Sequence, residues 1–213
     1  MQFFLDSCDV QRISELHDIG LVDGITTNPS LVAKSGRKHA ELLKEICSII
    51  KGPVSAQVLS SDASGMLSEA KELLQISEQI VIKVPSTWEG LKVCKQLTDN
   101  GHPVNVTLCF STAQALLAAK AGATYISPFI GRLDDIGGDG MGMIADICMA
   151  FENYPDIATQ VLVASVRSPL HVVEAAKIGA DIVTLPPHLL GQMLQHSLTD
   201  RGLEAFMNDS KAH

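Results

Sequence analysis

The sequence has little of what export, disulfide cross-linking or membrane insertion would require. Its 213 residues include five cysteines, an odd number without a Cys-x-x-Cys pair, which argues against a disulfide scaffold and favours a reducing cytoplasm. No apolar run approaches the ~18 residues of a membrane span. The first residues, Met-Gln-Phe-Phe-Leu-Asp, lack the basic segment and cleavage site of a signal peptide. We therefore expect a cytoplasmic protein with no membrane partner.

Cations and metal-binding patterns are also scarce. Sixteen Lys and Arg stand against 24 Asp and Glu, so the net charge is −8, which argues against nucleic acid as a partner. A single small anion is compatible with this balance, because it needs only a few well-placed cations. The seven histidines form no His-Glu-x-x-His motif, and Asp134, Asp135 and Asp139 do not follow the order of an EF-hand. The sequence predicts no metal site.

Short apolar runs alternate with longer segments of helical period along the whole chain, with helix starts at Asp9, Asp62, Thr87 and Ser168. Continuous apolar strands are typical of parallel sheets covered by helices. Eight strand–helix units of about 27 residues fit strands and helices of ordinary length. We predict one α/β domain over residues 1–213, a single (β/α)8 TIM barrel rather than an open sheet, with an additional C-terminal helix at about 199–210. The predicted strands are Phe3–Leu5, Gly24–Thr26, Val54–Val58, Ile80–Val84, Val104–Leu108, Tyr125–Pro128, Val161–Ala164 and Asp181–Leu185.

Polar residues follow these strands at their carboxyl ends, where the chemistry of such barrels gathers. Lys83 is the most informative, because a lysine inside Val81-Ile82-Lys83-Val84-Pro85 must point into the barrel, reach its rim or pair with Asp6. Burial lowers the pKa of a lysine, and the neutral amine can form a Schiff base with a carbonyl. The other residues at these ends are Asp6, Asn28, Gln57, Asn105, Thr107, Ser127, Ser165 and Arg167.

Each of these side chains also has a simpler interpretation. Asp6 could cap a helix, although Ser7 and Asp9 are available for that, and the cluster Thr26–Ser30 could be a turn with a helix cap. Arg132 and Arg167, with Ser165, suit a phosphate through charge-assisted hydrogen bonds. Alternatively, each arginine pairs with a surface acid such as Asp134 or Asp135.

Five segments together resemble the small transaldolase and fructose-6-phosphate aldolase family of class I aldolases, over essentially the whole chain. The first and fourth are the most specific. The segments are Gly24-Ile25-Thr26-Thr27-Asn28-Pro29-Ser30, Val81-Ile82-Lys83-Val84-Pro85, Asn105-Val106-Thr107, Ser127-Pro128-Phe129-Ile130-Gly131-Arg132 and Ala164-Ser165-Val166-Arg167.

The resemblance implies roles for these residues and no metal or organic cofactor. Lys83 would form a Schiff base with the C2 ketone of a sugar phosphate such as fructose 6-phosphate or sedoheptulose 7-phosphate. Asp6 would take the C4 hydroxyl proton, while Thr107 and Gln57 would position a water. The remaining residues would bind substrate: Asn28 and Asn105 the hydroxyls of the three-carbon unit, with Thr26, Ser127 and Phe129 nearby, and Arg132, Ser165 and Arg167 the phosphate.

Within this family the chain is closer to the transaldolases, which transfer a dihydroxyacetone unit in the pentose phosphate pathway. The aldolases typically carry Tyr where this chain has Phe129, and phenylalanine cannot protonate a bound enamine. Gln57 favours the alternative, a fructose-6-phosphate aldolase that releases free dihydroxyacetone, because transaldolases usually have Glu there. A barrel that only binds sugar phosphates, as a sensor or scaffold, is a third hypothesis. The resemblance also implies a homo-oligomer, a pentamer or a decamer, in which the C-terminal helix packs on a neighbour.

Overall fold

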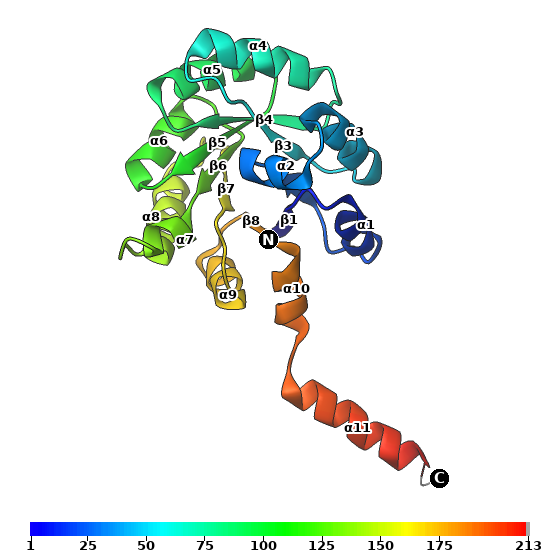
Figure 1. Cartoon of the computed structure of the whole chain (residues 1–213). Helices are drawn as coiled ribbons and strands as arrows, with labels where there is room; N and C mark the ends of the chain where they lie inside the picture. The colour runs from blue at the N-terminus through cyan, green and yellow to red at the C-terminus, as the bar shows by residue number, and fades with distance from the viewer. Residues whose placement is uncertain (212–213) are drawn as a thin grey trace.

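The computed structural model describes residues 1–211 and confirms the predicted barrel. Eight parallel strands close into a ring in chain order, and the helices lie around it (Figure 1). The strand boundaries agree with the predicted ones to within about one residue. They are β1 (Gln2–Asp6), β2 (Gly24–Thr26), β3 (Val54–Gln57), β4 (Ile80–Pro85), β5 (Val104–Cys109), β6 (Tyr125–Pro128), β7 (Gln160–Val163) and β8 (Ile182–Leu185).

Most helices begin at a side chain that accepts a hydrogen bond from the first helical turn, which satisfies a backbone donor that has no partner within the helix. The predicted starts Asp9, Asp62, Thr87 and Ser168 all act in this way. The helices are α1 (Val10–Asp18), α2 (Pro29–Ser35), α3 (His39–Ile49), α4 (Ala63–Leu74), α5 (Trp88–Asp99), α6 (Thr112–Lys120), α7 (Ile130–Asp134), α8 (Gly140–Glu152), α9 (Pro169–Ile178), α10 (Pro187–Leu194) and α11 (Ser197–Lys211).

Two intervals are more divided than the sequence predicts. One helical region is expected between β2 and β3 and one helix between β6 and β7, but each interval holds two helices. Gly36 ends α2 with a φ of 66°, and Gly137 lies between α7 and α8 with a φ of 78°. Both values lie in the left-handed region, which glycine adopts without steric cost and which stops a right-handed helix. The short helices α2 and α7 directly follow β2 and β6 and so lie at the carboxyl ends of these strands.

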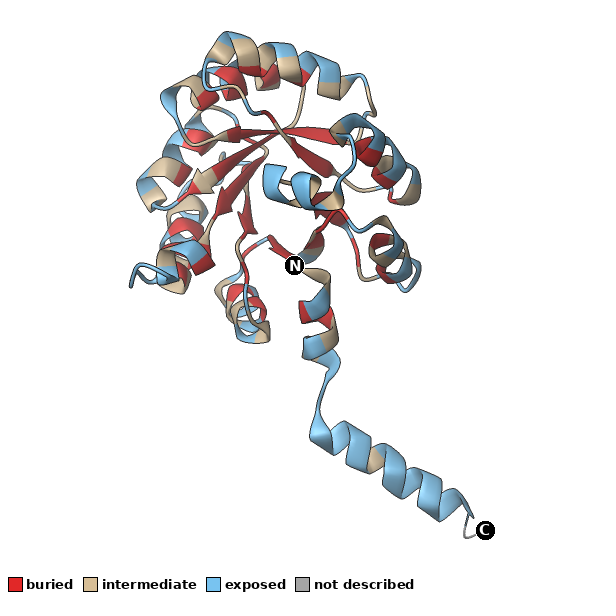
Figure 2. Cartoon of the chain, in the orientation of Figure 1, coloured by how far each residue is buried: buried red, intermediate tan, exposed pale blue. Residues whose placement is uncertain are grey.

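The core has two parts, one between strands and helices and one inside the barrel. Most buried apolar side chains belong to the outer layer, and most strand residues are buried (Figure 2). Five residues form a separate cluster inside the ring, in which the rings of Phe4 and Tyr125 meet edge to face at 6.0 Å. This cluster fills the barrel interior below the strand ends. It contains Phe4, Val81, Tyr125, Leu162 and Ile182.

The predicted C-terminal helix is α11, which projects away from the barrel (Figure 1). No residue of α11 is buried (Figure 2). Within residues 1–211, no helix is both long and apolar enough to cross a membrane.

Candidate active site

The apolar cluster inside the barrel determines which polar side chains face the same interior. Side chains two residues apart on a strand point to the same face. The residue two positions after each member of the cluster therefore also points inward, one layer closer to the carboxyl ends of the strands. These residues are Asp6, Lys83, Ser127, Ala164 and Thr184, and all five line one cavity.

The cavity has a volume of about 190 Å³ and opens at the carboxyl ends of the strands. Loop residues and the two short helices complete its wall. Most of the predicted site residues lie here, although far apart in sequence. The lining residues are Asp6, Thr26, Asn28, Pro29, Ser30, Gln57, Lys83, Leu108, Ser127, Phe129, Arg132, Ala164, Ser165 and Thr184.

Lys83 lies in the cavity with only 4% of its surface exposed. Its Nζ donates a hydrogen bond to the backbone oxygen of Thr27 at 3.2 Å. Within residues 1–211 no ion pair of 4.0 Å or less joins it to Asp6, so the paired alternative does not hold. Burial lowers the pKa of Lys83 to about 8, an effect that the charge of Asp6 opposes and that of Arg132 reinforces. Roughly a tenth of the amine is thus neutral near pH 7, far more than for a lysine in water.

Asp6 ends β1 and is held by two side chains from the β2 region. Thr26 Oγ1 and Asn28 Nδ2 both donate to Asp6 Oδ1, at 3.1 and 3.2 Å. Thr184 Oγ1 lies 2.7 Å from Thr26 Oγ1 and extends this network to β8. Burial raises the pKa of Asp6, although the charge of Lys83 and both hydrogen bonds oppose the shift. Because Asp9 caps α1, Asp6 is free of that structural role.

A second hydrogen-bonded group crosses from β3 to β6. Asn105 Nδ2 donates to Ser55 Oγ at 3.1 Å, and Ser127 Oγ donates to Asn105 Oδ1 at 2.7 Å. Asn105 is opposite Lys83 in the β4–β5 register, and Gln57 is opposite Lys83 on the other side. The buried hydroxyl of Thr107 makes no hydrogen bond with any described residue. A buried hydroxyl of this kind can hold a water.

The two arginines are placed differently. Arg132 lines the cavity, with its guanidinium carbon 5.0 Å from the centre of the Phe129 ring, a cation–π arrangement. Arg167 is not among the described lining residues, and its guanidinium instead forms two hydrogen bonds of 2.5 Å with Asp135. Of the two interpretations of Arg167, pairing with a surface acid is the one present in this structure.

Two residues of the cavity wall have a left-handed backbone although they are not glycine. Leu108 has a φ of 58° and Ser165 a φ of 62°. Leu108 coincides with an irregularity in the β5–β6 register between Val106 and Cys109. Such conformations are costly for these residue types and cluster at functional sites. The strain therefore lies where the cavity wall must depart from regular strand geometry.

Among the polar residues of the site that sequence reasoning missed is Thr184. It stands inside the apolar run Ile182-Val183-Thr184-Leu185 and there resembles any β-branched strand residue. A buried hydroxyl requires a hydrogen-bond partner. A threonine in an otherwise apolar strand is therefore the sequence signal that could indicate a polar site residue here.

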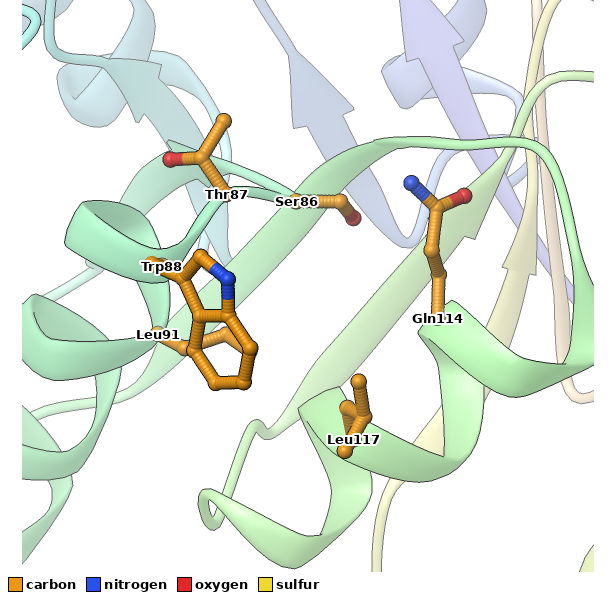
Figure 3. Close-up of a pocket in the computed structure, with 6 residues that line it drawn as sticks. All are labelled: Ser86, Thr87, Trp88, Leu91, Gln114 and Leu117. Carbon is orange, nitrogen blue, oxygen red and sulfur yellow. The ribbon is translucent and has the colours of Figure 1, made fainter.

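The described residues also form other cavities. One of about 220 Å³ lies between α5 and α6, is bordered by Trp88, Leu91 and Leu117, and contains none of the predicted site residues (Figure 3). Among residues 1–211, no group of three or more His, Cys, Asp and Glu side chains could hold a metal ion.

Residues 3–213 match the family described as Transaldolase/Fructose-6-phosphate aldolase. The chain belongs to this family. It is therefore an enzyme of the transaldolase/fructose-6-phosphate aldolase type, as its sequence resemblance implies.

Full-length relatives agree with this membership. A probable transaldolase of Ruegeria sp. (strain TM1040) is 56% identical over 212 residues, which cover 100% of this chain and 97% of the relative. A probable transaldolase of Paracoccus denitrificans (strain Pd 1222) is 58% identical, covering 98% and 96%. One of Methanococcus vannielii is 57% identical, covering 100% and 99%. The likeness thus extends over nearly the full length of each relative.

Proposed function

We propose that the chain is a transaldolase that transfers a dihydroxyacetone unit from a ketose phosphate to an aldose phosphate through a Schiff base on Lys83. The observation that carries the proposal is the buried amine of Lys83, with a pKa of about 8, in a cavity that also holds Asp6. Fructose 6-phosphate and sedoheptulose 7-phosphate are the proposed donors, as in the pentose phosphate pathway. The relatives are named probable transaldolases, which supports the transfer reaction.

The first step is attack of the neutral Lys83 amine on the C2 carbonyl, which forms a carbinolamine. Loss of water then gives a protonated imine. This step moves protons between nitrogen, oxygen and water. The unpartnered hydroxyl of Thr107 and the amide of Gln57 would position the water for these transfers.

The second step breaks the C3–C4 bond. Asp6 takes the proton of the C4 hydroxyl, the bond electrons flow into the protonated imine, and an aldose phosphate leaves. The three carbons that remain on Lys83 form an enamine, held at its hydroxyls by Asn28 and Asn105, with Thr26 and Ser127 nearby. Attack on a second aldose phosphate and hydrolysis of the new imine complete the transfer.

Two features favour transfer over release of the three-carbon unit. Phe129 lines the cavity and has no proton to give, so the enamine should persist until an aldehyde arrives. Arg132, Ser165 and Arg167 form a proposed phosphate site that would accept both the donor and the acceptor. The reaction needs no metal or organic cofactor in this scheme.

Reductive trapping tests the covalent step. With fructose 6-phosphate and borohydride, a three-carbon adduct should form on Lys83, and its initial rate should follow the neutral fraction of the amine. With a pKa of about 8, the rate should fall about tenfold for each pH unit below 8 and level off above it. Peptide mass spectrometry locates the adduct. A pH-independent rate or an adduct elsewhere would contradict the role of Lys83.

Gln57 supports the second candidate, a fructose-6-phosphate aldolase, because the transaldolases that this chain resembles usually have glutamate there. An amide can orient a water but cannot accept its proton. Replacing Gln57 with glutamate supplies a base, and we expect transfer to erythrose 4-phosphate to accelerate by about tenfold or more. The matched control is Gln75→Glu, the same substitution at the exposed C-terminal end of α4 and outside the cavity lining. Release of free dihydroxyacetone by the wild type, without transfer to the acceptor, would favour the aldolase instead.

We further propose that the chain is a single domain that acts in the cytoplasm as a homo-oligomer, a pentamer or a decamer. The support for assembly is α11, which extends from the barrel with large apolar side chains in solvent. Exposed apolar surface of this kind marks protein interfaces. These side chains are Leu198, Leu203, Phe206 and Met207.

A further inference from the structure

The side chain of Arg167 follows a defined path from the end of β7 to the end of α7. It crosses Gly131, where an added Cβ would lie 2.7 Å from Arg167 Nε. Its Nη1 and Nη2 then donate to Oδ1 and Oδ2 of Asp135, both at 2.5 Å, and both side chains are about half exposed. Glycine at position 131 therefore leaves room for Arg167 to reach Asp135.

Asp135 is the acidic side chain that hydrogen-bonds Arg167, an arginine of the proposed phosphate site. The hydrogen bonds and charge of Arg167, in addition to the charge of Arg132, lower the pKa of Asp135. The neighbouring Asp134 is engaged elsewhere, since its Oδ1 accepts from the backbone of Gly140 at 2.9 Å and its Oδ2 lies 3.8 Å from His171 Nε2. Asp135 thus already neutralises part of the positive charge to which a phosphate would bind.

We propose that Asp135 is an internal competitor for the substrate phosphate, which must displace it from Arg167. A carboxylate and a phosphate both bind the outer edge of a guanidinium through two parallel N–H donors. Asp135 uses both Nη atoms of Arg167, so phosphate binding is an exchange of one anion for another. This inference rests on the proposed function, in which Arg167 binds phosphate.

An exchange of this kind suits a transferase. The first half-reaction must release an aldose phosphate before the acceptor can bind, and the second must release a ketose phosphate before the next donor can bind. A resident carboxylate that returns to Arg167 when phosphate leaves weakens the hold on the product. Asp135 therefore raises KM for phosphorylated substrates and acts on the reaction only through Arg167, as a positioning and specificity residue.

The test is Asp135→Asn, which removes the negative charge and keeps the shape of the side chain. KM for fructose 6-phosphate and the inhibition constant of inorganic phosphate should both fall about two- to fivefold, the size expected for an exposed ion pair, with kcat not raised. KM for fructose, which has no phosphate, should not fall. The matched control is Asp99→Asn, which also removes one negative charge, from an exposed pair with Lys95 at the end of α5.

Repeating the measurements in an Arg167→Leu background distinguishes a failure of the competition by Asp135 from a failure of the phosphate role of Arg167. In this background, Asp135→Asn should no longer lower KM for fructose 6-phosphate. A higher KM in Asp135→Asn alone, or a KM equal to that of Asp99→Asn, would overturn the competition. If Arg167→Leu leaves the preference for fructose 6-phosphate over fructose unchanged, the phosphate role of Arg167 in the proposed function fails, and the competition fails with it.

Discussion

Replacing Lys83 with methionine should lower kcat for transfer from fructose 6-phosphate by about 10⁴-fold or more, because the variant has no nucleophile for the ketone. Borohydride should then fix no three-carbon adduct on the chain. Methionine matches the length of the lysine stem and needs no hydrogen-bond partner. Transfer is measured with erythrose 4-phosphate as acceptor.

The fold should survive this substitution. Lys83 is buried, and an ammonium group that is removed from water is itself destabilising. The native hydrogen bond that disappears is the one from Nζ to the backbone oxygen of Thr27. We therefore expect the thermal unfolding midpoint not to fall by more than a few degrees.

Lys92→Met is the matched control, since Lys92 lies on α5, is exposed and pairs with Glu89. It should retain both transfer and the adduct. Residual transfer of more than about 1% in Lys83→Met would show that the chemistry does not pass through this amine. A wild-type chain that binds sugar phosphates without turning them over would favour the sensor or scaffold hypothesis.

The barrel could be predicted because its strands are continuous apolar runs, and only a parallel sheet with helices outside buries both faces of so many strands. The same logic identified Asp6, Lys83 and Ser127 as polar groups at the ends of apolar runs. That these three residues belong to one site could be predicted from the topology, because the carboxyl ends of all strands meet at one mouth of a barrel.

Other features depend on contacts that local sequence does not encode. Arg167 and Asp135 are 32 residues apart in sequence, and nothing in either segment selects this pairing over a phosphate ligand. The left-handed backbone of Leu108 and Ser165 opposes the preference of both residue types, so only the surrounding structure can hold it. Two helical regions are each divided at a glycine with a left-handed φ, Gly36 or Gly137. The sequence alone does not determine these φ values.

Replacing Asp6 with asparagine should lower kcat by about 10²- to 10⁴-fold, because the amide cannot take the C4 hydroxyl proton. Imine formation on Lys83 should persist, so borohydride should now trap the uncleaved six-carbon sugar phosphate rather than the three-carbon unit. Asparagine Oδ1 can still accept the hydrogen bonds from Thr26 and Asn28. The two adducts differ in mass and in phosphate content.

The variant should also shift the pH dependence of trapping. The negative charge of Asp6 opposes the lowering of the Lys83 pKa, so removing that charge should move the pKa below 8 and shift the acid limb of the trapping rate to lower pH. Asp9→Asn is the matched control, because Asp9 caps α1 and asparagine is an equally good cap. Asp9→Asn should leave both the three-carbon adduct and the acid limb of the trapping rate as they are in the wild type. A three-carbon adduct that forms in Asp6→Asn at the wild-type rate would remove Asp6 from the cleavage step, while an acid limb at or above pH 8 would remove its charge from the environment of Lys83.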